Sequence, residues 1–215
     1  MKPEEYRKDP CGASSLPFWK TNTVEIPPSV VIERDDVFSG VREPDSDEPY
    51  FKIIHRLSGL SPQTPPPGFS FVSADAVRFA GHIQSCYEDE SVTAEELLRH
   101  TEDPVYHPEL WIAIRDDASG RIVASGIADL DDTIREGILE WIQVSPEFRR
   151  RGFGKLVVNE LLYRMRGKAD FATVSGRLNS ESDPFSLYRS CDFCDPVVWH
   201  VVRKRPRCES FCSKE

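Results

Sequence analysis

The sequence lacks any long hydrophobic run. No uninterrupted apolar stretch in its 215 residues approaches the roughly 18 residues that a membrane-spanning helix requires. The N-terminal segment MKPEEYRKDP also lacks the apolar core of a secretory signal peptide, so we expect a cytoplasmic protein. In that reducing compartment the six cysteines are expected to be free thiols and not a disulfide framework.

An excess of positive charge is missing as well. Acidic residues outnumber basic residues by 36 to 27, which gives a net charge of -9. We therefore expect neither nucleic acid nor an anionic membrane as a partner, because both are bound by clustered Lys and Arg side chains. The basic run from Arg203 to Arg207 is interpreted as a solvated tail, with a contact to a ligand phosphate or to nucleic acid as the alternative.

Common signatures of nucleotide and metal sites are absent or incomplete. The chain has neither a Walker-type glycine-rich loop ending in Gly-Lys-Ser/Thr nor a G-x-G-x-x-G turn. Four late cysteines follow a C-x2-C and C-x3-C order that could hold zinc, namely Cys191, Cys194, Cys208 and Cys212. Because no zinc-ribbon glycines or turns surround these cysteines, we expect thiols without a metal.

Proline divides the chain. The run SPQTPPPG at 61–68 is expected to form a semi-rigid connector and a domain boundary. The irregular extension before this run contains two predicted strands, Val30–Glu33 and Tyr50–Leu57. These strands are too short to fold alone, so we expect the extension to dock on the core. The predicted units are the extension 1–68, the core 69–205 and the tail 206–215.

After residue 68 the pattern changes to the α/β (α+β) class. Periodicity predicts helices over Asp75–Tyr87, Thr93–His100, Gly154–Arg166 and Pro184–Ser190. It predicts strands over Phe69–Val72, Leu110–Arg115, Arg121–Asp129, Gly137–Val144, Phe171–Ser175 and Val197–Arg203. Ser73 is the expected N-cap of the first helix, and Thr93 with Glu96 forms a capping box for the second.

The most informative segment runs from Leu139 to Lys155. A buried strand ends at Val144, and Pro146 stops it because proline has no N–H to donate. Gly152 and Gly154 lead into a helix and allow the backbone to approach a ligand closely. The free N–H groups at the helix start favour an anion, so an anion site is predicted here. The alternative is a tight turn in which the three arginines form a solvated face.

This segment resembles the signature of the GNAT superfamily of N-acetyltransferases, V-x-P-x-x-[Q/R]-x-x-G-x-[G/A]. The matching residues are Val144, Pro146, Arg149, Gly152 and Gly154. A later family motif, an asparagine followed by L-Y-x-x-x-G-F, is similar to Asn179 and the segment Leu187 to Phe193. Asp192 replaces the usual glycine there, and aspartate tolerates the left-handed backbone which that position often needs. The resemblance covers about residues 69–203 and is nearest to uncharacterised bacterial members.

The resemblance implies the GNAT fold, a mixed and mostly antiparallel central sheet flanked by helices. It also implies acetyl-coenzyme A as cosubstrate. The backbone of Ile142, Gln143 and Val144 would pair with the pantetheine arm and hold the thioester carbonyl. The pyrophosphate would be bound by N–H groups of Arg149, Arg150, Arg151, Gly152, Phe153, Gly154 and Lys155. Asn179 would help to position this cosubstrate.

The resemblance further implies direct transfer of the acetyl group to a primary amine in a ternary complex. Tyr188 would protonate the leaving thiolate, with a purely structural role as the alternative. Glu140 is the candidate base, on a strand face expected to include Ile138, Glu140, Ile142 and Val144. The family base commonly lies two residues earlier, at Ile138, so Glu140 could instead be a structural carboxylate. Glu136 is an alternative base.

The remaining residues do not identify the acceptor amine. His200 on the last strand is expected to be packed or solvated and not a base. The acceptor is a small-molecule or protein amine, and acceptor sites in this fold are built by variable loops outside the motif. The competing interpretation is a non-catalytic acyl-coenzyme A-binding module that acts through protein interactions. We expect a monomer or homodimer.

Overall fold

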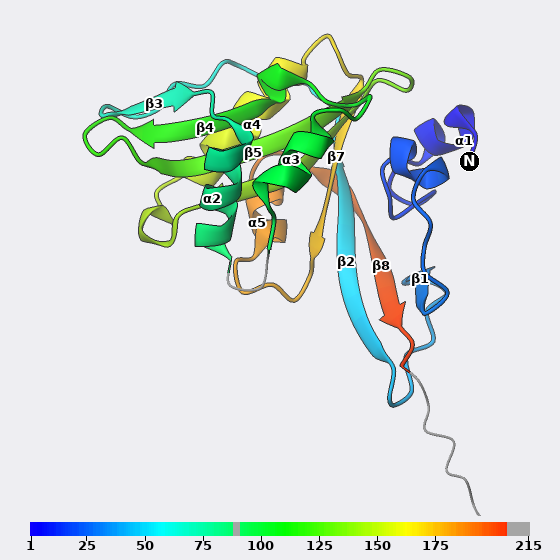
Figure 1. Cartoon of the computed structure of the whole chain (residues 1–215). Helices are drawn as coiled ribbons and strands as arrows, with labels where there is room; N and C mark the ends of the chain where they lie inside the picture. Colours follow the sequence, from blue (N-terminus) through cyan, green and yellow to red (C-terminus); the bar gives the residue numbers. More distant parts are fainter. Residues whose placement is uncertain (88–90, 206–215) are drawn as a thin grey trace, which may run out of the picture.

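The computed structural model describes residues 1–87 and 91–205. Its centre is an eight-stranded sheet with the order β1-β8-β2-β7-β6-β5-β4-β3. Strands β6 and β7 pair in parallel, whereas the other neighbours pair antiparallel. This arrangement, with helices on both faces, confirms the predicted fold class (Figure 1).

Each predicted helix and strand is present, although several ends differ. The strands are β1 (Val30–Arg34), β2 (Ser46–His55), β3 (Phe69–Val72), β4 (Trp111–Asp116), β5 (Ile122–Asp131), β6 (Glu136–Val144), β7 (Phe171–Arg177) and β8 (Cys194–Arg203). The α-helices are α1 (Pro3–Lys8), α2 (Ala76–Cys86), α3 (Ala94–His100), α4 (Phe153–Met165) and α5 (Pro184–Arg189). Short 3-10 helices are η1 (Phe18–Asn22), η2 (Pro108–Leu110) and η3 (Pro146–Phe148). Sequence patterns missed α1 and η1, which are too short to show helical periodicity.

The helices form a layer on each face of the sheet. On one face, Phe79 and Ile83 of α2 pack with Trp111 and Ile127 of the sheet. On the other face, α4 lies so close to β5 that a Cβ on Gly126 would come within 2.5 Å of a methyl carbon of Val157. The small residue therefore sets the spacing between helix and sheet, and α4 buries a continuous apolar stripe.

The extension before residue 69 contributes to the middle of the sheet. Strand β2 lies between β7 and β8 and pairs antiparallel with both. Tyr50, for example, is opposite Arg177 on one side and Trp199 on the other. The connector at 61–68 therefore separates two segments of one sheet. Figure 1 shows β2 and β8 as a long pair that extends beyond the helical layers.

The segment before β1 covers the same face of the sheet as α2 and α3. Tyr6 and Phe18 are buried there against Ile54 of β2 and Phe171 of β7. The indole N–H of Trp199 donates to the Cys11 carbonyl at 2.9 Å. These contacts hold the first 22 residues against strands that are far away in the sequence.

Two predicted helix starts differ in outcome. The capping box of Thr93 and Glu96 is present at the start of α3. The N-cap of α2, however, is Asp75 and not Ser73. The Asp75 carboxylate accepts from the Arg78 N–H at 2.8 Å, which satisfies a donor that the helix leaves free, and Ser73 lies two residues too early.

The structure also bears on the expected free thiols and on possible metal-binding and membrane-spanning segments. Cys191 and Cys194 are free thiols, and Cys208 and Cys212 lie outside the described residues. Within 1–87 and 91–205, no group of three or more His, Cys, Asp or Glu side chains could hold a metal ion. In the same residues no helix is long and apolar enough to cross a membrane.

Candidate active site

Strands β6 and β7 separate halfway along their length. They pair only over Glu136–Leu139 and Phe171–Val174 in the described sheet. Beyond that point β7 continues along β2, and β6 continues along β5 alone up to Val144. The β6 edge from 140 to 144 therefore has no strand partner on the β7 side. Such an edge can offer N–H and C=O groups to an extended ligand.

A β-bulge marks the point of separation. Ile127 is opposite Trp141 while its neighbour Ala128 is opposite Leu139, so Glu140 is an extra residue in β6. The predicted common face for Ile138, Glu140, Ile142 and Val144 is therefore wrong. The extra residue reverses the alternation, so that Ile138 lies on the α3 face beside Asp129, whereas Ile142 and Val144 pack on the α4 side.

The predicted phosphate loop connects β6 to α4. Arg150 and Gly152 have left-handed backbones, with φ of 63° and 86°. These two residues turn the chain into α4. The first N–H groups of this helix belong to Phe153, Gly154 and Lys155, and they have no carbonyl of a preceding helical turn to donate to. The helix start is thus available to an anion. Gly154 has a packing role, since a Cβ there would lie 3.3 Å from a Leu187 methyl carbon of α5.

Several side chains of the loop hold the loop itself. Arg149 donates to the carbonyls of Cys86, at 2.8 Å, and Val144, at 3.2 Å. The Lys155 ammonium donates to the Ser190 carbonyl at the end of α5. Phe153 is buried in the core, whereas Arg150, Arg151 and Asn179 are exposed. Arg149 and Lys155 are exposed too but donate to backbone carbonyls, so Arg150 and Arg151 are the loop cations best placed to meet an anion.

A buried polar layer supports the end of β6. The His82 ring contacts the hydroxyls of Ser125, at 2.8 Å, and Ser145, at 3.0 Å. Gln143 donates to the same Ser125 hydroxyl from β6. Burial lowers the pKa of His82 to about 4, so the ring is neutral at pH 7. The Gln143 side chain points into this layer, which leaves only its backbone for contact with a ligand.

Tyr188 lies on α5, close to the separated strands. Its side chain is 5% exposed and packs against Phe51 and Phe193. Burial raises the pKa of the phenol, so the hydroxyl keeps its proton at neutral pH. Sequence reasoning missed Tyr87, whose hydroxyl donates to the Ile142 carbonyl at 3.1 Å on β6. Tyr87 follows α2 directly, and only its place at a helix end could have signalled it.

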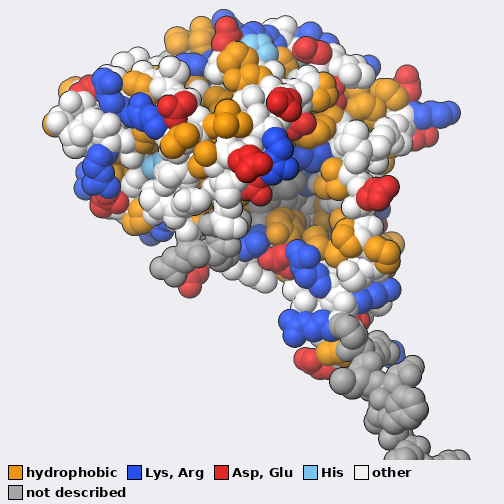
Figure 2. Space-filling model, viewed as in Figure 1, with side chains coloured by type: hydrophobic (Ala, Val, Ile, Leu, Met, Phe, Trp, Pro, Cys, Tyr) orange, Lys and Arg blue, Asp and Glu red, His pale blue; other side chains and the backbone are white. Residues whose placement is uncertain are grey.

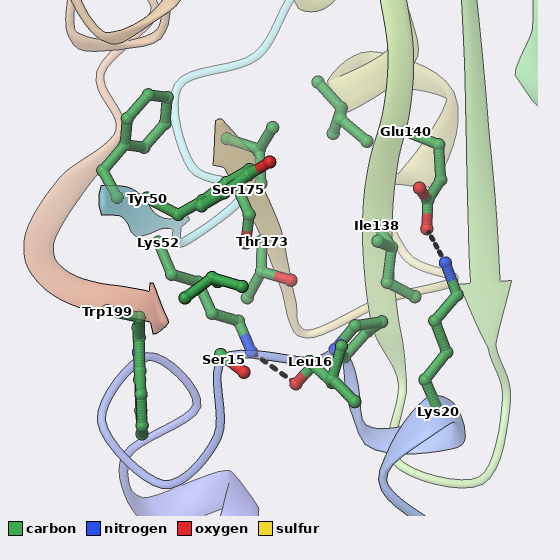
Figure 3. Close-up of a pocket in the computed structure, with 15 residues that line it drawn as sticks. Ser15, Leu16, Lys20, Tyr50, Lys52, Ile138, Glu140, Thr173, Ser175 and Trp199 are labelled. Atoms are coloured by element: carbon green, nitrogen blue, oxygen red, sulfur yellow. Dashed lines mark hydrogen bonds and ion pairs between the residues drawn. The ribbon is translucent and has the colours of Figure 1, made fainter. Parts of the chain in front are cut away.

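A cavity of about 280 Å³ lies on the α3 face at the strand separation. The N-terminal segment, β2, β6, β7 and β8 all contribute to its wall (Figure 3). Glu140 of β6 and Lys20 of η1 form an ion pair of 2.8 Å in this wall. Figure 2 shows that the molecule is hollowed between the helical body and the long β2–β8 pair.

The carboxylate of Glu136, the alternative base, is buried and bonded to three protein donors. It accepts from the Tyr6 hydroxyl at 2.7 Å, the Thr173 hydroxyl at 2.7 Å and the Phe18 N–H at 3.1 Å. Burial raises the pKa of Glu136 and, for the same reason, lowers that of the nearby Lys52 to about 8. With its oxygens occupied, Glu136 holds the N-terminal segment and is poorly placed to take a proton from a ligand.

His200 is packed, as predicted. One ring nitrogen contacts Asp47 at 2.8 Å and the other contacts Asp35 at 3.1 Å, while Phe38 stacks on the ring. The histidine therefore ties the connection between β1 and β2 to β8. Of the basic run, Arg203 pairs with Glu48, and residues 206 and 207 lie outside the described ranges.

Comparison with known proteins bears on this arrangement. A family model described as an acetyltransferase (GNAT) domain matches residues 107–194, which include β4 to α5 and the whole phosphate loop. Residues 107–194 thus match a GNAT acetyltransferase domain. No curated protein matches the chain in sequence. The domain match thus covers both separated strands and Tyr188, and it ends where β8 begins.

Solved structures share the GNAT fold at low identity. A GCN5-related N-acetyltransferase from Sphaerobacter thermophilus is 21% identical, with a TM-score of 0.61 over 74% of this chain and 52% of its own. A GNAT-family acetyltransferase from Colwellia psychrerythraea is 12% identical, with a TM-score of 0.54 over 74% and 57%. A fungal GCN5-related glucosamine N-acetyltransferase region is 15% identical, with a TM-score of 0.54 over 74% and 21%. The chain described here thus spans about half the length of the Sphaerobacter protein.

Proposed function

We propose that this protein is an N-acetyltransferase that moves an acetyl group from acetyl-coenzyme A to a primary amine by direct attack in a ternary complex. The observation that carries the proposal is the separation of β6 from β7 beside the α4 N-terminus. An unpaired strand edge suits the amide-rich pantetheine arm, and the adjoining helix start suits its pyrophosphate.

The residues fit acetyl-coenzyme A as a cosubstrate. The backbone from Ile142 to Val144 would hold the pantetheine arm and polarise the thioester carbonyl. The N–H groups from Arg149 to Lys155 would bind the pyrophosphate, with Arg150 and Arg151 adding exposed positive charge. Bound acetyl-coenzyme A supplies the activated acyl group, and exposed Asn179 lies at the turn after β7 where it could help to position it.

Two side chains would handle protons. Tyr188 would donate its phenolic proton to the leaving thiolate, and its raised pKa keeps that proton in place until transfer. Glu140 would accept a proton from the amine, because the bulge turns its carboxylate into the cavity at the strand separation.

Release of free thiol from acetyl-coenzyme A with a panel of amines tests the proposal. We expect amine-dependent thiol release, with a rate that Glu140→Gln lowers without weakening cosubstrate binding. Glu147→Gln is the matched control, because Glu147 is an exposed carboxylate paired with Arg121 away from the cavity. Thiol release that no amine stimulates would contradict the proposal.

The second candidate is a binding module that holds acyl-coenzyme A without turnover. The ion pair between Glu140 and Lys20 favours it, because the candidate base is occupied by the protein itself. Tight cosubstrate binding without thiol release for any amine would select this alternative.

A further inference from the structure

The ion pair in the cavity has an unusual origin. Lys20 comes from η1, in the segment before β1, and Glu140 is the extra residue of the β6 bulge, 120 residues later. The two side chains are only 26% and 23% exposed. Figure 3 shows the Lys20 side chain reaching from the N-terminal segment to the Glu140 carboxylate. An ammonium therefore already occupies the carboxylate proposed to receive the acceptor amine.

The surroundings favour a cation at this position. Burial opposes the charge on Lys20, but Glu140, with Asp129 and Asp103 behind it, raises the Lys20 pKa above its ordinary value. Asp129 is fully buried and pairs with His100 at 2.8 Å. Its second carboxylate oxygen has no hydrogen-bond partner in the described part of the chain. Asp129 thus adds a second carboxylate near Glu140 to the negative charge that the Lys20 ammonium meets.

The walls beside Lys20 suit an aliphatic stem. Leu16, Pro17 and Ile138 line the cavity next to the ion pair. The other lysine in the wall, Lys52, is buried and donates to the Leu16 carbonyl at 2.7 Å and to the Tyr6 hydroxyl at 2.9 Å. Lys52 therefore holds the N-terminal segment, whereas Lys20 alone presents its ammonium to the base.

On the basis of the proposed function, we propose that Lys20 is an internal competitor for the acceptor site. The acceptor is then a cationic primary amine on an unbranched aliphatic stem, which displaces the Lys20 ammonium from Glu140. This displacement would select against neutral compounds, since only a cation compensates the Glu140 carboxylate that Lys20 leaves. It would also keep the candidate base paired when no acceptor is bound.

The test measures amine binding directly and without acetyl-coenzyme A. Calorimetric titration of the full chain with n-butylamine at pH 7 compares the wild type, Lys20→Met and Lys20→Arg. We expect Lys20→Met to bind the amine about fivefold more tightly, because the competing ion pair is gone, and Lys20→Arg to bind like the wild type. Adding Glu140→Gln to Lys20→Met should abolish the gain. The neutral isostere 1-butanol should bind none of the variants measurably.

Arg121→Met is the matched control, since it removes an exposed ion pair with Glu147 and should leave amine binding unchanged. Equal or weaker amine binding by a Lys20→Met protein that melts like the wild type overturns the proposal, as does equal binding of 1-butanol. If Lys20→Met loosens the N-terminal segment, the nitrogen resonance of the Lys20 ammonium in the wild type decides. It should move on addition of n-butylamine, and an unmoved resonance at saturation overturns the proposal.

The two proposals fail separately in these experiments. Amine binding that follows the Lys20 variants, with no thiol release from acetyl-coenzyme A, would overturn the enzymatic function and retain the amine site. Thiol release together with amine binding that is the same in all Lys20 variants would retain the enzymatic function and overturn the role of Lys20.

Discussion

The two halves of the candidate site are built in opposite ways. The predicted phosphate loop is a run of consecutive residues, and its candidate anion site consists of backbone at left-handed Arg150 and Gly152 and at the start of α4. The acceptor cavity is assembled from side chains of four strands and the N-terminal segment. Its ion pair, Lys20 to Glu140, joins residues 120 positions apart, and the Phe18 N–H that holds the N-terminal segment donates to Glu136, 118 positions later.

This difference separates what is general from what is particular to this chain. Any helix start attracts an anion, so the loop needs only a turn of the right shape. A cavity built from distant side chains depends on the whole sheet, and β2 places the wall residues Tyr50 and Lys52. We therefore expect changes in the loop to affect the cosubstrate and changes in the N-terminal segment to affect the acceptor.

Tyr188 lies between the two halves, and its removal should give the largest effect. We predict that Tyr188→Phe lowers the turnover rate by roughly 10²–10⁴-fold, because the leaving thiolate loses its proton donor, while cosubstrate affinity changes little. Steady-state thiol release and a separate binding titration measure the two quantities. Tyr163→Phe on α4 is the control. Equal losses of turnover and affinity would show that Tyr188 only packs against Phe51 and Phe193.

Glu136 offers a test confined to the acceptor half. Glu136→Ala leaves the Tyr6 and Thr173 hydroxyls and the Phe18 N–H without their buried acceptor. We predict a loss of about 3–5 kcal/mol in the free energy of unfolding, since a buried charge network loses a partner. Urea unfolding measures this loss.

The position of the damage is as informative as its size. Hydrogen exchange should be fastest in residues 1–22, and cosubstrate binding by the remaining folded protein should persist. Glu147→Ala, at an exposed ion pair, should change stability by less than about 1 kcal/mol. Loss of cosubstrate binding in folded Glu136→Ala would show that the acceptor half and the phosphate loop depend on each other.

The same contrast explains which features the sequence predicts. The α-helices and strands after residue 68 and the glycine-containing turn into α4 follow from local periodicity and from glycine and proline, and the structure contains them. The position of β2 between β7 and β8 does not follow, because strand order depends on long-range pairing. The bulge at Glu140 is also invisible to strict alternation, so the predicted common face of Ile138 and Ile142 is wrong.

Side-chain partners were equally hidden from sequence reasoning. Lys20 carries no motif, and only the fold brings it to Glu140. Tyr87 ends a predicted helix and gives no sign that its hydroxyl reaches the Ile142 carbonyl. The roles of Glu140 and Tyr188 themselves stay predictions that the kinetic variants must decide.

Gly152 provides the converse test, confined to the loop. We predict that Gly152→Val weakens cosubstrate binding and lowers stability by about 1–2 kcal/mol, because its φ of 86° is strained for a residue with a Cβ. Gly167→Val, at the other end of α4 with a φ of 79°, should lower stability similarly without affecting the cosubstrate. Binding of n-butylamine should be unchanged in both variants. A loss of amine binding in Gly152→Val would show that the loop and the acceptor cavity are not independent.

The smallest expected effect concerns His200, which lies in neither half. Burial lowers its pKa, but the carboxylates of Asp47 and Asp35 outweigh burial and raise the pKa above its ordinary value. The folded state therefore binds this proton more tightly than the unfolded state. The resulting stabilisation is fully present below the unfolded pKa of about 6.5 and is lost as the pH rises through the higher folded pKa.

The His100–Asp129 pair raises the pKa of His100 in the same direction, so wild-type stability alone cannot isolate His200. The difference between wild type and His200→Gln can. We predict that this difference in unfolding free energy is larger at pH 6 than at pH 8.5, by less than about 1 kcal/mol. Urea unfolding at both pH values measures it. Since His200 ties the connection after β1 to β8 and not to the cavity, binding of cosubstrate and of n-butylamine should be equal in the two proteins.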